Sequence, residues 1–331
     1  MKVAVTGVGG GVGQSILKAL QPTSHEMVGI DGDLLATGLY GVSSAYQGYY
    51  ANTDKFLPFL EKVCDQEKVE VLFPGLDAEL PYLAGSKSWL EKKTGTQVVV
   101  SSPSVVDIAD DKLLTYEFLE KNGFPALETY KVQDYDDQLD FPVVVKPCQG
   151  GARSVGKKVI KDPATLEEFK KIPQAQNYVV QEYSTGKEYT CGTLFLDDFI
   201  GAIIMTRQLR CGDTYKAFVV QDEKIQDYLQ EVIQVLNPWG PCNVQLRLKD
   251  GVPYIFEFNA RCSGTTASRA LAGFNEPLMV CDYLQGENIV FNIKEMAILR
   301  YWSELTVSYN QIEEMKLNRY LENQKNHLGG N

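Results

Sequence analysis

Residues 252–261 read Val-Pro-Tyr-Ile-Phe-Glu-Phe-Asn-Ala-Arg, an apolar run that ends in polar side chains at alternate positions. Side chains two residues apart on a β-strand point to one face, so the pattern places Glu257 and Asn259 together. A carboxylate and an amide oxygen on a rigid face suit Mg²⁺, which binds a few protein oxygens and keeps substrate phosphates as its other ligands. Arg261 continues the alternation and could bring a guanidinium to the same phosphates.

A second strand precedes this one and predicts a hairpin. Residues 243–247 read Asn-Val-Gln-Leu-Arg and offer Gln245, and Lys249-Asp250-Gly251 is typical of a turn between two strands. The alternative is an ordinary hairpin with a polar, solvated face. Such a face would carry scattered Lys, Thr and Glu, whereas this one carries Gln, Glu, Asn and Arg, which can serve a metal and its phosphates.

The composition is that of a globular chain without a nucleic-acid-binding face. Its 331 residues are enough for two or three lobes with buried cores, and the formal net charge is −11. Nucleic-acid binding needs a basic face, so this charge argues against such a partner. No apolar run approaches the roughly eighteen residues that span a bilayer, and the first residues lead directly into a strand, without room for a secretory signal. We expect a cytoplasmic enzyme without a membrane partner.

Cysteine and histidine usage excludes several kinds of site. The seven cysteines are scattered and contain no Cys-x-x-Cys pair, which favours reduced thiols over disulfides or a zinc site. The only histidines, His25 and His327, lie near the ends of the sequence. Histidine-based catalysis and histidine-rich metal sites are therefore not expected.

Strand and helix patterns divide the chain into three parts. Strands are predicted at 3–6, 27–31, 69–73 and 97–100, with helices at 13–20, 56–63 and 77–84 between them. This alternation predicts an open parallel α/β domain over residues 1–102. A smaller α+β unit is expected over 103–185. Residues 186–331 carry further strands, an amphipathic helix at 223–236 and the hairpin.

Two glycine-rich loops could approach anions. The first, residues 6–13, follows a strand and opens a helix, but Val12 stands where a Gly-x-Gly-x-x-Gly motif needs its third glycine. With Asp31 ending the next strand, it could bind a dinucleotide, bind a small anionic substrate, or only pack helix on strand. The second loop follows Lys146, whose stem leaves a buried strand and which needs an anionic partner, or it is a flexible hairpin.

Other polar residues indicate a function only when they are considered together. Residues 181–190 follow a buried strand and are typical of a hinge that could read an adenine, with Glu188 on the ribose. Lys112 opens a predicted helix, and Arg207 and Arg210 form either an anion clamp or a solvated strand end. Along the chain, an Asp-Lys pair before a helix is followed by a strand that ends in Lys-Pro and a Gly-rich loop. A hinge with Gly-x-Glu comes next, and the series ends with a Gln and the motif Glu-x-Asn-x-Arg. This series resembles the ATP-grasp superfamily, and within it stand-alone relatives of the carbamoyl-phosphate synthase large subunit.

The resemblance implies a fold and a set of site residues. The fold would be an N-terminal open parallel α/β (pre-ATP-grasp) domain, residues 1–102, followed by a two-lobed ATP-grasp fold, with a small lobe at 103–185 and a C-terminal lobe at 186–331. ATP would be bound by three groups of residues. These are the lysines Lys112 and Lys146, the lid residues Gly150, Gly151, Ser154 and Gly156, and the hinge residues Gln181, Glu182, Tyr183, Ser184 and Glu188. One or two Mg²⁺ ions, or Mn²⁺ in their place, would be held by Gln245, Glu257 and Asn259, and Arg261 with Lys146 would act on the phosphoryl group.

The resemblance also implies an activity. It is ATP- and Mg²⁺-dependent ligation of a carboxylate to an amine or thiol through an acyl phosphate, with small-molecule substrates. The alternatives are an ATP-binding subunit of a split carbamoyl-phosphate-synthase-like complex, a non-catalytic nucleotide-binding module, or a nicotinamide dehydrogenase using the first glycine loop. The protein could act as a homodimer or with a partner subunit, whether it is a ligase or an ATP-binding subunit. Two residues depart from the family pattern: Gln181, where glutamate is common, and Cys191-Gly192, where an acidic residue often follows the hinge.

Overall fold

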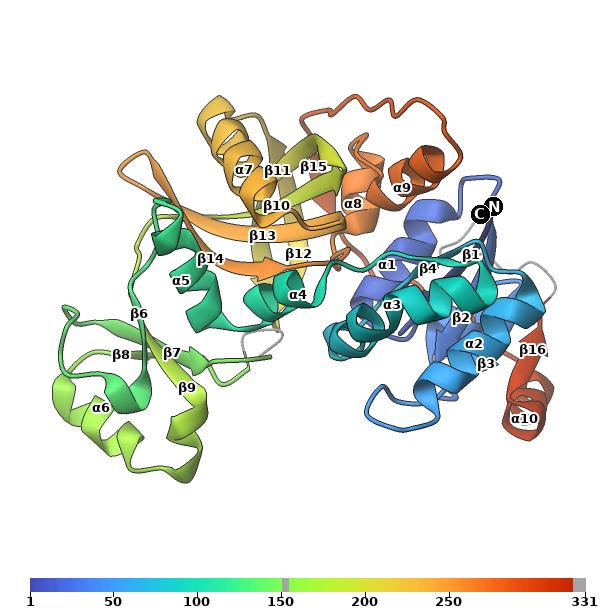
Figure 1. Ribbon diagram of the computed structural model, residues 1–331, viewed down its shortest axis with the longest axis horizontal. Helices are drawn as coiled ribbons and strands as arrows, with labels where there is room; N and C mark the ends of the chain where they lie inside the picture. Colours follow the sequence, from blue (N-terminus) through green and yellow to red (C-terminus); the bar gives the residue numbers. More distant parts are fainter. Residues whose placement is uncertain (151–154, 324–331) are drawn as a thin grey trace.

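Three sheets make up the architecture. The computed structural model describes residues 1–150 and 155–323. In Figure 1 the N-terminal unit and the green small lobe lie at opposite ends of the molecule, with the large C-terminal sheet between them. Within the described residues no helix is both long enough and apolar enough to cross a membrane. All seven cysteines are unpaired.

The N-terminal sheet is parallel apart from one edge strand. Its order is β16-β3-β2-β1-β4-β5. The strands are β1 (Lys2–Thr6), β2 (Glu26–Asp31), β3 (Ser44–Gln47), β4 (Val71–Phe73), β5 (Gln97–Val98) and β16 (Tyr320–Glu322), and the helices between them are α1 (Gly11–Leu20), α2 (Phe56–Glu67) and α3 (Leu80–Thr94). Alternate residues of β1 enter two different cores, because Val3 and Val5 pack with α1, whereas Ala4 packs with α2 and α3. The predicted open α/β fold is confirmed.

One strand crosses the predicted domain limits. The limits 102 and 185 remain predictions, but β16, from the part assigned to the third unit, pairs antiparallel with β3, Tyr320 facing Tyr46. It follows helix α10 (Tyr309–Asn318). Neither β3 nor β16 was predicted, since strands of three or four residues carry too little alternation to show a pattern.

The small lobe is an antiparallel sheet with its own core. Its order is β6-β9-β7-β8. The strands are β6 (Thr129–Lys131), β7 (Val143–Pro147), β8 (Lys158–Ile160) and β9 (Tyr178–Glu182), and α6 (Pro163–Lys170) covers them. Val143, Val145, Leu166 and Val180 are buried in a cluster confined to this lobe. Helices α4 (Pro103–Asp110) and α5 (Lys112–Lys121) connect it to the N-terminal unit.

The large sheet carries the hairpin. Its order is β14-β13-β10-β11-β12-β15. The strands are β10 (Lys187–Leu196), β11 (Asp198–Arg210), β12 (Asp213–Val220), β13 (Gly240–Lys249), β14 (Val252–Asn259) and β15 (Ala297–Leu299), accompanied by α7 (Glu223–Leu236), α8 (Thr266–Leu271) and α9 (Glu276–Leu284). The β13–β14 turn consists of Asp250 and Gly251 with φ of 53° and 76°, the two positive values that a tight type I′ hairpin turn requires.

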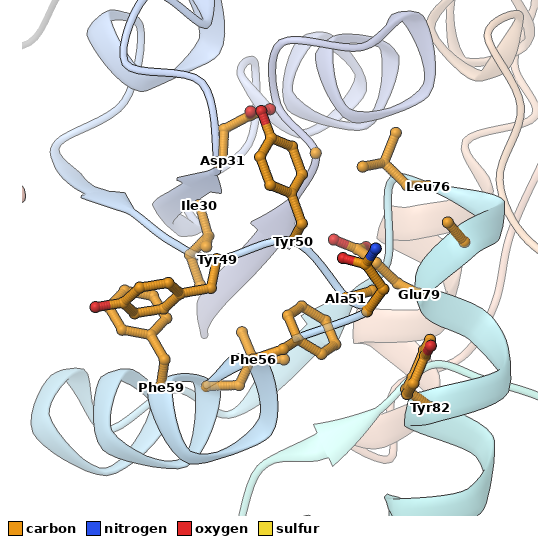
Figure 2. Close-up of a pocket in the computed structure, with 15 residues that line it drawn as sticks. Ile30, Asp31, Tyr49, Tyr50, Ala51, Phe56, Phe59, Leu76, Glu79 and Tyr82 are labelled. Atoms are coloured by element: carbon orange, nitrogen blue, oxygen red, sulfur yellow. The ribbon is translucent and has the colours of Figure 1, made fainter. Parts of the chain in front are cut away.

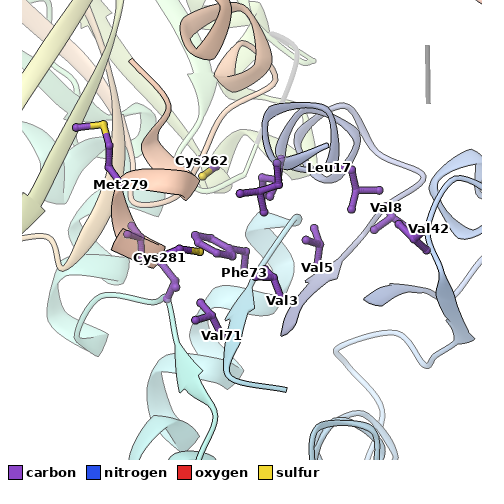
Figure 3. Close-up of a cluster of buried hydrophobic side chains, with 14 of the residues drawn as sticks. Val3, Val5, Val8, Leu17, Val42, Val71, Phe73, Cys262, Met279 and Cys281 are labelled. Atoms are coloured by element: carbon purple, nitrogen blue, oxygen red, sulfur yellow. The ribbon is translucent and has the colours of Figure 1, made fainter. Parts of the chain in front are cut away.

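A continuous hydrophobic core joins the large sheet to the N-terminal unit. Val3, Val5 and Phe73 from the N-terminal sheet share one buried cluster with Cys262 and Met279, which lie beyond the hairpin. Figure 3 shows these side chains meeting between the two units. Because protein cores are close-packed, this shared core fixes the hairpin relative to the first glycine-rich loop.

Candidate active site

A large cavity lies where the three units meet. Its volume is about 880 Å³, within the range of small-molecule sites. The predicted site residues that line it are Lys112, Lys146, Gly150, Gln181, Glu182, Tyr183, Ser184, Glu188, Gln245, Glu257, Asn259 and Arg261. Gly156 is not among the lining residues, and Gly151 and Ser154 lie outside the described residues. Most of the residues singled out from sequence therefore share one cavity.

The hairpin presents its polar residues as the alternation predicted. Gln245 pairs with Glu257 and Asn243 with Asn259 across β13 and β14, and a register shift follows Gln245. Asn259 Nδ2 donates to Glu257 Oε1 at 3.0 Å, so the carboxylate and the amide are direct neighbours. Their adjacency on a paired strand provides a rigid pair of oxygen-bearing groups at the cavity.

The hairpin oxygens fit a hard divalent cation that keeps phosphate ligands. Mg²⁺ takes one or two protein carboxylates and completes its shell with waters and phosphates, so a full protein cage is not needed. The described residues contain no cluster of three or more His, Cys, Asp or Glu that could form such a cage. Glu257 and Asn259 can supply oxygens. Gln245 Oε1 instead accepts from Arg207 Nη2 at 2.7 Å, so its place as a third ligand stays a prediction.

Two lysines face the same cavity from the small-lobe side. Lys112 Nζ donates to the carbonyls of Asp110 and Gly150 at 3.2 and 2.6 Å. Lys146 Nζ donates to the Phe256 carbonyl at 3.2 Å. Within the described residues neither ammonium pairs with a carboxylate. Among the described residues both buried amino groups donate only to neutral oxygens, as expected of side chains that receive an anion.

Burial strongly perturbs Lys146. Its side chain leaves β7 and is only 8% exposed. Removal from water lowers the pKa of Lys146 to about 7; Glu257 opposes this shift, and Lys112 and Lys157 add to it. A dianionic or trianionic phosphate beside Lys146 would restore the charged form. Perturbed lysines in clefts are typical of functional sites.

Glu188 is held by two arginines. Arg207 Nη2 lies 3.2 Å from Glu188 Oε1, and Arg247 Nη2 lies 2.7 Å from Oε2. Both carboxylate oxygens are thus engaged, and a ribose hydroxyl would have to share one of them. The ribose role of Glu188 stays a prediction.

The hinge residues lie at the end of β9. Gln181 Nε2 donates to Thr129 Oγ1 at 2.9 Å, which turns the amide oxygen in the opposite direction. Glu182 accepts from Lys249 at 3.2 Å, Tyr183 is partly exposed, and Ser184 is buried. These residues form one edge of the cavity, where a flat heterocycle would meet main-chain groups.

The first glycine-rich loop reaches the far end of the cavity. Gly10 and Gly11 line it at the start of α1, whose N-cap, Gly10, provides no side-chain cap. Asp31 Oδ2 accepts from the Gly9 amide at 2.7 Å. The acid at the end of β2 therefore holds the loop itself. A Cβ at Gly13 would lie 2.3 Å from the Gly7 carbonyl oxygen, so this glycine permits close packing of helix on strand.

Arg261 connects the hairpin to the N-terminal unit. Its Nη2 lies 2.7 Å from Asp77 Oδ2, and the arginine side chain is 10% exposed. Asp77 begins the short 3₁₀ helix η2 (Asp77–Glu79) after β4. Both residues line the cavity, so this pair links the two units that share a core.

A second, smaller cavity lies beside the first. Its volume is about 410 Å³, and it opens at the carboxyl edge of the N-terminal sheet. Figure 2 shows Tyr50, Phe56 and Tyr82 around it, with Glu79 at one side. Burial raises the pKa of Glu79 to about 7, and the hydroxyl of Thr6, which donates to this carboxyl, limits the shift. Leu76 and Ala78 line both cavities, so the two are neighbours.

Sequence reasoning missed several charged residues at the cavity. Arg247 follows Gln245 by two positions on β13, and strand alternation could have assigned it to the same face. Asp77 and Arg300 gave no local signal. Arg300 follows the short edge strand β15 and donates to the Thr214 carbonyl at 3.0 Å. Arg207 is neither a free anion clamp nor a solvated strand end, because it contacts Gln245 and Glu188.

The sequence matches known proteins in part. Residues 174–305 match the family model described as ATP-grasp in the biosynthetic pathway with Ter operon. The carbamoyl phosphate synthase large chain of Agathobacter rectalis is 29% identical over 199 residues, which are 52% of this chain but 18% of that protein. A D-alanine–D-alanine ligase of Bacillus anthracis is 26% identical over 249 residues, 66% of this chain and 81% of that protein. The chain thus spans only about a fifth of the synthase but most of the ligase.

Solved structures share the fold along most of the chain. An N5-carboxyaminoimidazole ribonucleotide synthetase in complex with ADP superposes with a TM-score of 0.72 at 14% identity, covering 89% of this chain and 79% of that one. The L-amino acid ligase from Bacillus licheniformis gives 0.65 at 16% identity, covering 85% and 73%. The family match over residues 174–305 and the sequence relatives agree on the ATP-grasp superfamily, and the solved structures share its fold along most of the chain.

Proposed function

We propose that the protein is an ATP- and Mg²⁺-dependent ligase that joins a small carboxylate to an amine through an acyl phosphate. The observation that carries the proposal is a pair of buried lysines that have no carboxylate partner among the described residues and share one cavity with the Glu257–Asn259 pair. Cations on one side and metal-binding oxygens on the other match what a transferring phosphoryl group requires, since its catalysis rests on positioning and charge neutralisation.

Each wall of the cavity has a role in this proposal. The adenine would lie at Gln181–Ser184, the phosphates between Lys112 and Lys146, and Mg²⁺ at Glu257 and Asn259. Bound Mg²⁺ would neutralise charge on the β- and γ-phosphate oxygens. Arg261, which Asp77 holds in place, would then stabilise the phosphoryl group during transfer.

The carboxylate acceptor would lie at the N-terminal end of the cavity. Gly10 and Gly11 line that end, and the uncapped amides at the start of α1 favour a negative charge. The adjacent smaller cavity extends the space available to an acceptor that is larger than a simple amino acid. The printed names of the relatives include a D-alanine–D-alanine ligase and an L-amino acid ligase, which supports an amino-acid acceptor class.

A second candidate is an ATP-binding chain that needs a partner subunit. The matched carbamoyl phosphate synthase chains favour it, because this chain covers only 18% of their length. The two candidates share the nucleotide site and differ in whether the isolated chain turns over.

One experiment separates them. Purified protein is mixed with ATP, Mg²⁺ and pairs from a panel of amino acids and other small carboxylates and amines, and release of ADP and phosphate is measured. Acceptor-dependent release supports the ligase. Nucleotide binding by calorimetry without release for any pair supports the partner-dependent chain. Failure to bind ATP with Mg²⁺ would overturn both.

A further inference from the structure

A fully buried ion pair lies behind the metal-binding hairpin. Arg269 on α8 and Glu276 at the start of α9 are both 0% exposed, and Arg269 Nη1 lies 2.6 Å from Glu276 Oε1. Gly192 on β10 leaves the room for them, because a Cβ there would lie 2.5 Å from each of these two atoms. Buried ion pairs often stabilise a fold less than apolar residues of equal volume, so this pair calls for another role.

The guanidinium continues into a chain of amides that ends at the cavity. Arg269 Nη2 donates to Asn243 Oδ1, which also accepts from Thr190 Oγ1 at 3.0 Å. Asn243 Nδ2 then donates to Asn259 Oδ1 at 3.4 Å, the longest link. Asn259 Nδ2 donates to Glu257 Oε1 at 3.0 Å. The chain crosses from α8 through β13 to β14.

The two ends of this chain set its direction. A guanidinium has only donors, so Asn243 has to turn its oxygen toward Arg269 and its NH₂ toward Asn259. Asn259 then presents its oxygen to Asn243 and its NH₂ to Glu257, whose carboxylate has only acceptors. With either amide reversed, two donors or two acceptors would face each other at a buried site, which costs free energy.

We propose that Arg269 and Asn243 are positioning residues for the metal carboxylate. Through Asn259 they hold Glu257 Oε1, which leaves Oε2 for the cation. Asn259 keeps a second lone pair on its own oxygen for the same ion. The proposal rests on the proposed function, since it assigns Glu257 to Mg²⁺. Groups that orient metal ligands commonly change metal affinity by about 10- to 100-fold when altered.

The test is Asn243→Asp, read by binding of Mn²⁺ in the presence of a non-hydrolysable ATP analogue. Free Mn²⁺ is measured by electron paramagnetic resonance, so the readout does not depend on turnover. The aspartate keeps its acceptors toward Arg269 and Thr190 but cannot donate to Asn259. We expect Mn²⁺ affinity to fall about 10-fold or more. The added negative charge alone would strengthen cation binding, so weaker binding cannot come from charge.

Two further variants keep the test independent of folding. Thr193→Val removes a buried hydrogen bond that β10, the strand of Thr190, makes outside the chain of amides, from Thr193 Oγ1 to the Cys242 carbonyl at 2.9 Å. It should lower stability and leave Mn²⁺ affinity unchanged. Thr190→Val removes one donor to Asn243 and should weaken Mn²⁺ binding about threefold, a smaller share of the same effect. Thr190→Val provides the test of the proposal if the aspartate variant does not fold.

The outcomes separate this proposal from the proposed function. Weakened Mn²⁺ binding in Asn243→Asp and Thr190→Val, with Thr193→Val like the wild type, supports the positioning role. Wild-type Mn²⁺ affinity in Asn243→Asp or, if only that one folds, in Thr190→Val overturns it and leaves the ligase proposal standing. Absence of Mn²⁺ binding to the wild-type protein with the nucleotide analogue removes the metal site itself, and both proposals fail with it.

Discussion

The arginines on the hairpin side of the cavity have carboxylate partners, whereas the two lysines on the small-lobe side have none among the described residues. Glu188 contacts Arg207 and Arg247, and Arg261 contacts Asp77. Within residues 1–150 and 155–323, Lys112 and Lys146 donate only to main-chain carbonyls. The arginines of the hairpin wall are therefore paired before any ligand arrives, whereas the lysines of the small-lobe wall gain a counter-ion only when an anion binds.

The hairpin wall and the small-lobe wall of the cavity also differ in how they are packed. The hairpin belongs to a sheet that shares its core with the N-terminal unit, while the small lobe has a core of its own. A wall fixed by a shared core can hold catalytic groups at constant geometry, which is the condition for electrostatic preorganisation. The small lobe does not share this core.

The largest effect on ATP turnover is expected from a change on the hairpin wall. Glu257→Gln should lower ATP turnover about a hundredfold or more, because a neutral amide holds Mg²⁺ poorly and removes preorganised charge from the transferring phosphoryl group. Nucleotide affinity measured without metal should change much less.

Asp250→Asn is the matched control for Glu257→Gln. It removes the same charge from the turn of the same hairpin, away from the cavity, and asparagine tolerates the positive φ of 53° there. Turnover in this control should equal that of the wild type. Wild-type turnover in Glu257→Gln would mean that the metal lies elsewhere.

Sequence reasoning found what local patterns encode. The turn at Asp250-Gly251, the helix at 223–236 and the alternation of Glu257 and Asn259 are each set by residues a few positions apart. Recognition of the ATP-grasp series then brought Lys112, Lys146 and the hinge residues into one site, although they lie in different parts of the chain.

Long-range pairs were not predictable in this way. Arg261 finds Asp77 across 184 positions, and Arg207 takes the oxygen of Gln245 that the sequence assigned to a metal. Such partners depend on register and packing, which no short pattern contains. Gly192 is a further case: as a departure from the family pattern it had no explanation, and the buried Arg269–Glu276 pair supplies one.

The small-lobe wall should take up a proton at Lys146 when ATP binds. Because burial lowers the pKa of Lys146 to about 7, the nucleotide-free protein holds this lysine mostly neutral at pH 8. Bound phosphates raise that pKa again, so ATP binding at pH 8 should take up close to one proton, about 0.9 for a single group with this pKa. Calorimetry in buffers of different ionisation enthalpy measures the uptake.

Lys146→Met separates this lysine from other sources of protons. The variant keeps the apolar stem, should bind ATP about 1.5–3 kcal/mol more weakly through loss of a charge-assisted contact, and should show no uptake from this site. Below pH 6 the wild-type lysine is already charged, and the uptake should vanish there as well. Equal uptake by the wild type and Lys146→Met at pH 8 would assign the proton to another group.

The smallest effect is expected at the first glycine-rich loop. Gly11→Ala adds a methyl group that meets nothing within 4 Å, at the start of α1 and on the cavity surface. If the nucleotide lies between the small lobe and the hairpin, the dissociation constant of ATP should stay within about twofold of the wild type, since this methyl group would touch only the acceptor end. Replacing glycine by alanine in a helix should raise the free energy of unfolding by about 0.5–1 kcal/mol, which shows that the variant is folded. Calorimetric titration with ATP and thermal unfolding measure both. A stable Gly11→Ala protein that no longer binds ATP would place the nucleotide at the N-terminal loop, and the two walls described above would then enclose the acceptor instead.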